Sequence, residues 1–216
     1  ALAAGNAFIL KPSEETPLVA HKVAELLQAA GLPDGLFQII HGDRKIGAAL
    51  CAHPGIAKIS LTGGVETGRM IMAQSAQSLK KITLELGGKS PLLVFEDCDF
   101  DLAVQTALDA NFYTGGEVCS NATRVFVQRS IADDFIAAMT ARTEAMRVGD
   151  PMASDIQMGA LISKRHLAKV LDYVKIGVDE GATIATGGNA LKPQGFENGY
   201  FMQPTILTNC HDDMRV

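Results

Sequence analysis

The segment KITLELGGKSPLLVF, residues 81–95, decides how the chain is organised. Two strand-like runs, 81–84 with β-branched residues and 92–95 with apolar residues, flank the pair Gly87-Gly88, which is typical of two strands separated by a break. Glu85 ends the first run. We therefore expect a boundary at the glycine pair, with a cofactor-binding part at residues 1–86 and a thiol-bearing catalytic part at residues 87–216.

Strands and helices alternate on both sides of this break. We expect strands at 7–10, 36–40, 58–61, 81–84, 92–95, 124–128, 182–186 and 202–207. We expect helices at 17–29, 46–52, 100–111, 131–146 and 164–179, and one that runs to Gln74. Thr16 is the expected N-cap of the first helix, and Gly31 lies just past its end. This alternation predicts an α/β fold: the second half of a doubly wound nucleotide-binding sheet, followed by part of an α/β catalytic domain.

Composition narrows the classes of function. The 216 residues carry 19 basic and 24 acidic side chains, a net charge of −5, with no basic cluster, so nucleic acid and anionic membranes are not expected partners. The apolar runs are too short to span a bilayer. Four dispersed cysteines favour a cytoplasmic location and predict neither a metal site nor a disulfide framework. The chain opens without methionine and closes without a finishing element, so we expect an internal fragment of a larger enzyme.

Cys119 and Glu85 are the candidate catalytic residues. Cys119 lies in a glycine-flanked loop, GGEVCSN, residues 115–121. A thiol in covalent catalysis needs a base, and Glu85 beside Gly87 could be that base or could activate water. From the residues alone, a buried structural cysteine and a solvated glutamate remain open alternatives.

Two turns after expected strands could bind a nucleotide. Lys11-Pro12-Ser13-Glu14 offers a lysine and a carboxylate for hydroxyl groups, although the residues alone favour a solvated turn that caps the next helix. Thr62-Gly63-Gly64 opens a helix whose free N–H groups suit a pyrophosphate, at Val65, Glu66 and Thr67. Its glycine spacing is not the dinucleotide fingerprint, so a plain helix cap is the alternative.

Two segments resemble the signature segments of the NAD(P)-dependent aldehyde dehydrogenases. They are Leu84–Pro91, LELGGKSP, and Gly116–Arg124, GEVCSNATR. The second is most similar to the betaine aldehyde dehydrogenase branch. The resemblance extends from Ala1 to Val216 in family order.

The resemblance implies a cofactor and its contacts. Lys11 and Glu14 match the family's lysine and glutamate that hold the adenosine ribose, and Leu61–Gly68 matches its phosphate turn. Leu61 and Gly64 depart from the usual aromatic residue and serine. Glu14 would repel a 2′-phosphate, so NAD is expected, with NADP left open.

The resemblance also implies a mechanism. Cys119 attacks an aldehyde to give a thiohemiacetal, hydride moves to the nicotinamide beside Gly87, and Glu85 activates the water that hydrolyses the thioester. Betaine aldehyde, giving glycine betaine, is the expected substrate, with ω-amino or aliphatic aldehydes as alternatives. The full-length parent is expected to be a homo-oligomer. The family's oxyanion asparagine and nicotinamide-ribose glutamate lie outside the chain, which predicts an inactive fragment.

Two other classes of function stay open. The chain could be an inactive nucleotide-binding module in which Cys119 has no catalytic role. It could instead be a cysteine hydrolase, but that needs a histidine near the thiol. None of the five histidines has a visible sequence link to Cys119: His21, His41, His53, His166 and His211.

Overall fold

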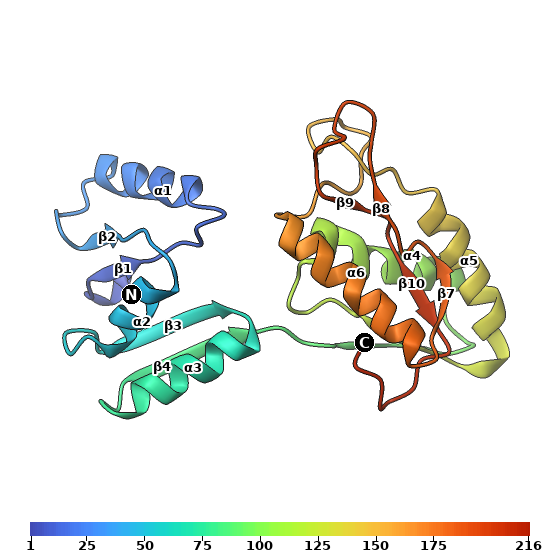
Figure 1. Cartoon of the computed structure of the whole chain (residues 1–216), viewed down its shortest axis with the longest axis horizontal. Helices are drawn as coiled ribbons and strands as arrows, with labels where there is room; N and C mark the ends of the chain where they lie inside the picture. The colour runs from blue at the N-terminus through green and yellow to red at the C-terminus, as the bar shows by residue number, and fades with distance from the viewer. The chain divides into compact units, whose positions relative to one another are not determined.

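The computed structural model describes all 216 residues and divides them into two compact units (Figure 1). The first unit is Ala1–Leu86 and the second is Gly87–Val216. Each contains parallel strands joined through helices, so the expected α/β class is confirmed. No helix is both long enough and apolar enough to cross a bilayer.

The first unit consists of two parallel strand pairs and three α-helices. Its elements are η1 (Leu2–Ala4), β1 (Phe8–Leu10), α1 (Leu18–Ala29), β2 (Phe37–Ile39), α2 (Arg44–Ala52), β3 (Lys58–Gly63), α3 (Val65–Ala76) and β4 (Lys81–Leu86). β1 pairs with β2, and β3 pairs with β4, as two separate two-stranded sheets. Figure 1 shows α3 beside β3 and β4. A helix therefore connects the strands of each pair, as in a nucleotide-binding half-domain.

Local sequence explains most helix ends in this unit. α2 is capped by Asp43, whose side chain accepts a hydrogen bond from the N–H of Lys45. The expected cap at Thr16 is wrong: Pro17 is the N-cap of α1, the helix begins at Leu18, and no side chain caps it. Gly31 lies past the end of α1 with a φ of +84°, where glycine avoids the steric strain of a Cβ.

β4 is longer than the sequence predicts. It continues to Leu86, so Glu85 lies inside the strand, in register with Thr62 of β3. The α3 helix packs closely on this strand, because a Cβ on the buried Gly68 would lie 3.1 Å from a methyl group of Leu86. The carboxyl ends of β3 and β4 therefore align at one edge.

The second unit combines a β–α–β crossover with two further helices and four short strands. Its elements are β5 (Pro91–Val94), α4 (Phe100–Phe112), η2 (Tyr113–Gly116), β6 (Arg124–Val127), η3 (Arg129–Ile131), α5 (Ala132–Glu144), α6 (Lys164–Asp179), β7 (Thr183–Thr186), β8 (Ala190–Leu191), β9 (Phe201–Met202) and β10 (Ile206–Thr208). β5 and β6 are parallel, whereas β7 pairs antiparallel with β10, and β8 with β9. The single strand expected at 202–207 is in fact two strands with different partners.

The main core lies between the β5–β6 pair, α4 and α5. Its buried residues are Val94, Val104, Ala107, Leu108, Phe135 and Met139. Phe100 meets Phe135 edge to face with ring centroids 6.0 Å apart, a favourable geometry for aromatic pairs. Asp99 caps α4 by accepting from the N–H of Leu102 at 3.1 Å. This core fixes the helix from which the cysteine loop departs.

Candidate active site

The cysteine loop connects α4 to β6 and begins with three residues in the left-handed region. Thr114, Gly115 and Gly116 have φ values of +51°, +67° and +80°. Such backbone cannot continue a right-handed helix, so α4 ends here and the chain turns back toward the strand. A Cβ on Gly116 would also lie 3.1 Å from the carbonyl oxygen of Asn111. Cys119 then lies exposed in the following turn.

Contacts on both sides hold this loop. The buried amide of Asn121 donates to the carbonyl oxygen of Asn111 at 3.3 Å, and the N–H of Ala122 donates to Ala110 at 3.3 Å. On the other side, a Cβ on Gly88 would lie 3.1 Å from the carbonyl oxygen of Cys119. The glycine pair of the boundary segment therefore lies against the cysteine, which the sequence separates by more than thirty residues.

The four thiols differ in their surroundings, and none forms a disulfide. Cys51 is buried in α2, and burial raises its pKa while Lys80 partly offsets the rise. Partial burial also raises the pKa of Cys210, although part of its side chain is exposed. Since the thiolate is the reactive form, these two cysteines are disfavoured as nucleophiles. Cys119 is exposed and lies in the glycine-containing loop.

A histidine reaches the cysteine loop, which sequence reasoning missed. Nε2 of His166, in the first turn of α6, lies 3.3 Å from Oε1 of Glu117. The ring contacts Glu117 rather than the thiol, so the arrangement is not the thiol–histidine pair of a cysteine hydrolase. No sequence pattern predicted this contact, because it joins a loop to a helix that is distant from it in the sequence.

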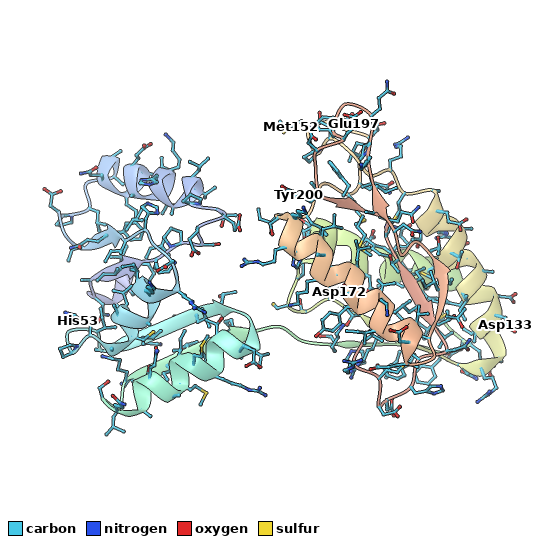
Figure 2. The ribbon with its side chains drawn as sticks, viewed as in Figure 1. His53, Asp133, Met152, Asp172, Glu197 and Tyr200 are labelled. Carbon is cyan, nitrogen blue, oxygen red and sulfur yellow. The ribbon has the colours of Figure 1, made fainter.

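A cavity of about 320 Å³ adjoins the loop. It is lined by Thr114, Gly115 and Glu117 and by residues 151 and 156–161. Figure 2 labels Met152, Glu197 and Tyr200 in the two loops at this end of the second unit. The N–H of Leu161 donates to the carbonyl oxygen of Tyr200 at 2.9 Å, which ties the cavity wall to the β8–β9 hairpin.

The two predicted nucleotide turns both follow parallel strands of the first unit. Lys11 follows β1, and its Nζ donates to the carbonyl oxygens of Pro12 at 2.9 Å and Gly42 at 2.7 Å. Two of the three ammonium donors are thus used, and one remains. Ser13 and Glu14 are exposed, and the hydroxyl of Ser13 accepts from the N–H of Glu15 at 3.2 Å.

The second turn ends β3 at Gly63 and begins α3 at Val65. Gly64 is the extended N-cap between them, and a Cβ there would meet nothing within 4 Å. The first N–H groups of α3, from Val65 to Thr67, have no acceptor within the helix, so they fit an anionic phosphate. Glu66 in this turn pairs with Arg69 at 2.9 Å. The geometry suits a nucleotide phosphate beside Gly64.

Glu85 and Gly87 complete the set of residues predicted from the sequence. The side chain of Glu85 is exposed on β4, and a Cβ on Gly87 would have open space around it. The structure therefore brings together Gly88 and Cys119 within the second unit, and the ends of β3 and β4 within the first.

Comparisons with known proteins identify the family. The family model described as the aldehyde dehydrogenase family matches residues 1–216. The chain is 54% identical to betaine aldehyde dehydrogenase from Vibrio vulnificus strain YJ016 over 214 residues, which are 99% of this chain and 44% of that protein. It is 51% identical to betaine aldehyde dehydrogenase from Brucella anthropi over 216 residues, again 44% of that protein.

A solved structure agrees with the sequence matches. The crystal structure of betaine aldehyde dehydrogenase from Staphylococcus aureus in complex with NAD⁺ superposes with a TM-score of 0.97 at 40% identity, covering 100% of this chain and 43% of that one. The chain thus spans less than half the length of the curated relatives it matches. The resemblance inferred from the two signature segments is confirmed, and the chain belongs to the aldehyde dehydrogenase family.

Proposed function

We propose that this chain is part of a longer enzyme that oxidises betaine aldehyde to glycine betaine with NAD. The observation that carries the proposal is an exposed cysteine in a left-handed loop, in a chain more than half identical to betaine aldehyde dehydrogenases. Because the chain covers 44% of those relatives, the complete activity requires residues from the rest of the enzyme. The same resemblance suggests a cytoplasmic enzyme that forms a homo-oligomer. Size-exclusion chromatography of the full-length protein would test the oligomeric state.

Cys119 is the proposed nucleophile. Its sulfur adds to the aldehyde carbon and forms a thiohemiacetal, whose oxygen carries negative charge as the bond forms. The backbone N–H of Cys119 makes no hydrogen bond in the structure, so this donor is available to the developing oxyanion. The backbone of Gly88 lies close to the carbonyl oxygen of Cys119, because a Cβ on Gly88 would lie 3.1 Å from it.

Glu85 is the proposed base for the second half-reaction. A carboxylate can take a proton from the water that attacks the thioester on Cys119, which releases the carboxylic acid. Its exposure on β4 is compatible with proton exchange with solvent. Glu85 precedes Gly88 by three residues in the sequence, and Gly88 touches the cysteine loop.

Residues of the first unit would hold NAD, which supplies the hydride acceptor when bound. Lys11 has a remaining donor for a ribose hydroxyl, and the exposed Glu14 could accept from two hydroxyls. The N–H groups after Gly64 would bind the pyrophosphate, and the open space at Gly87, the first residue of the second unit, would admit the nicotinamide. The carboxylate of Glu14 would repel a 2′-phosphate, which favours NAD over NADP.

A substrate comparison tests the proposal. We expect the full-length enzyme to prefer betaine aldehyde or an ω-amino aldehyde over acetaldehyde by at least about tenfold in kcat/KM, or about 1.4 kcal/mol. NADH formation with each aldehyde measures the ratio. Equal use of acetaldehyde would reject the betaine aldehyde assignment, and no NADH with any of the three would reject the dehydrogenase proposal.

A further inference from the structure

The cysteine loop carries a carboxylate two residues before the thiol, and this carboxylate has a partner on another element. Oε1 of Glu117 lies 3.3 Å from Nε2 of His166, with 50% and 34% of the two side chains exposed. This is the one ion pair of the chain that reaches residues 113–123. The loop is therefore joined to α6 through a single charged contact.

The amino end of α6 attracts a negative charge for further reasons. Its first turn contains Lys164 and Arg165 and no acidic residue. The backbone dipole of this 16-residue helix adds partial positive charge at the same end. Glu117 thus pairs with a side chain at a helix end that carries two cations and the positive end of the helix dipole.

Glu117 also borders the cavity beside the loop, whereas Cys119 does not. The other lining residues from the loop are Thr114 and Gly115, which precede Glu117. The residue that pairs with α6 is therefore one that lines the cavity, and the cysteine is not.

The position of this carboxylate matters to a nucleophilic thiol. The thiolate is the reactive form, and a nearby negative charge disfavours it. For two charges about 5 Å apart in a water-like dielectric, Coulomb's law gives about a fourfold change in the thiolate population. A Glu117 side chain released from α6 could approach the sulfur this closely, because only Val118 separates the two residues.

We propose that His166 is a positioning residue: by pairing with Glu117 it fixes the cysteine loop to α6 and keeps that carboxylate away from the Cys119 thiol. The proposal rests on the assignment of Cys119 as nucleophile. It gives His166 no contact with substrate, and it explains why an acidic residue is tolerated two positions before a reactive cysteine.

The test measures thiol reactivity in the full-length protein without aldehyde or NAD. Iodoacetamide is added, and mass spectrometry follows the alkylation of Cys119, with the exposed Cys210 as an internal reference. We expect His166→Ala to slow Cys119 about threefold to fourfold relative to Cys210. In His166→Lys a positive charge remains available to pair with Glu117, and the double variant His166→Ala/Glu117→Gln has no carboxylate to release. The alkylation rate of Cys119 in both should be within about 1.5-fold of wild type. His53→Ala, in the first unit (Figure 2), is the matched control and should change nothing.

Two results would overturn the proposal: an unchanged Cys119 rate in His166→Ala, or a double variant as slow as that single variant. If His166→Ala does not fold, Glu117→Gln alone tests the proposal. Its Cys119 must be alkylated at least as fast as in wild type, and slower alkylation would overturn the proposal. In turnover assays, His166→Ala should lower kcat and leave the aldehyde KM unchanged. The alkylation rates need no dehydrogenase activity. If the alkylation rate of Cys119 depends on His166 and Glu117 as expected but the protein oxidises no aldehyde, the proposed function is refuted and this inference stands.

Discussion

Replacing Gly116 with alanine should loosen the cysteine loop more than replacing Gly115. Both glycines have a positive φ, at +80° and +67°, and an L-residue there costs about 1–2 kcal/mol, partly offset by the lower entropy of the unfolded chain. Only Gly116 adds a contact, because its Cβ would lie 3.1 Å from the carbonyl oxygen of Asn111, whereas a Cβ on Gly115 meets nothing within 4 Å. Relieving that contact requires movement of backbone, which adds about 1 kcal/mol.

The two costs together destabilise the closed loop by about 2 kcal/mol in Gly116→Ala, and the strain alone destabilises it by about 1 kcal/mol in Gly115→Ala. Hydrogen exchange at the amide of Ala122 provides the assay, because this N–H donates to Ala110 and is released when the loop opens. We expect exchange about thirtyfold faster than wild type in Gly116→Ala and about fivefold faster in Gly115→Ala. Equal exchange rates in the two variants would refute the steric argument.

Further predictions concern strain, chemistry and core packing. Thr114→Asn should stabilise the loop by about 1 kcal/mol in the same exchange assay, because Thr114 is β-branched at a φ of +51° and asparagine tolerates that region. Cys119→Ala should abolish NADH formation by the full-length enzyme while NAD affinity by calorimetry stays near wild type; retained aldehyde oxidation would exclude Cys119 as nucleophile. Glu85→Gln should give one burst of NADH equal to the enzyme concentration and then slow turnover; an unchanged steady-state rate would assign the base to another residue. Val104→Ala should lower stability to urea by about 2–3 kcal/mol, because Val104 is fully buried in the core of the second unit.

Helices and strands whose bounds depend on their own residues were predicted well from the sequence. α6 has the predicted bounds, Lys164–Asp179, because its apolar periodicity lies within the segment and its cap, Ser163, directly precedes it. β4 exceeds its prediction because Glu85 and Leu86 pair with β3, and such pairing is invisible in the strand's own sequence. The segment 202–207 divides because its two ends pair with β8 and β7 respectively.

In the candidate site, too, local features were predictable from the sequence and tertiary contacts were not. The glycines before Cys119 indicated a loop, and all three residues from 114 to 116 have a positive φ. The contacts that hold the loop could not be found from patterns, since they join Gly88 to Cys119, Asn111 to Asn121, and Glu117 to His166. The interpretation that no histidine is linked to the thiol was incomplete for His166. Side chains meet there through tertiary packing, which periodicity does not encode.

The edge at which the thiol lies has a chemical consequence. In the first unit Lys11 and Gly64 follow strands, at the edge where helices begin, but the cysteine loop precedes β6 and Gly88 precedes β5. The loop thus lies at the amino ends of β5 and β6 within the second unit, where α4 ends and its last carbonyl groups carry partial negative charge. Those of Ala110 and Asn111 are occupied by donors from the loop itself. The dipole of α4 therefore does not stabilise an anionic sulfur, whereas backbone N–H groups of the loop, such as that of Cys119, can do so.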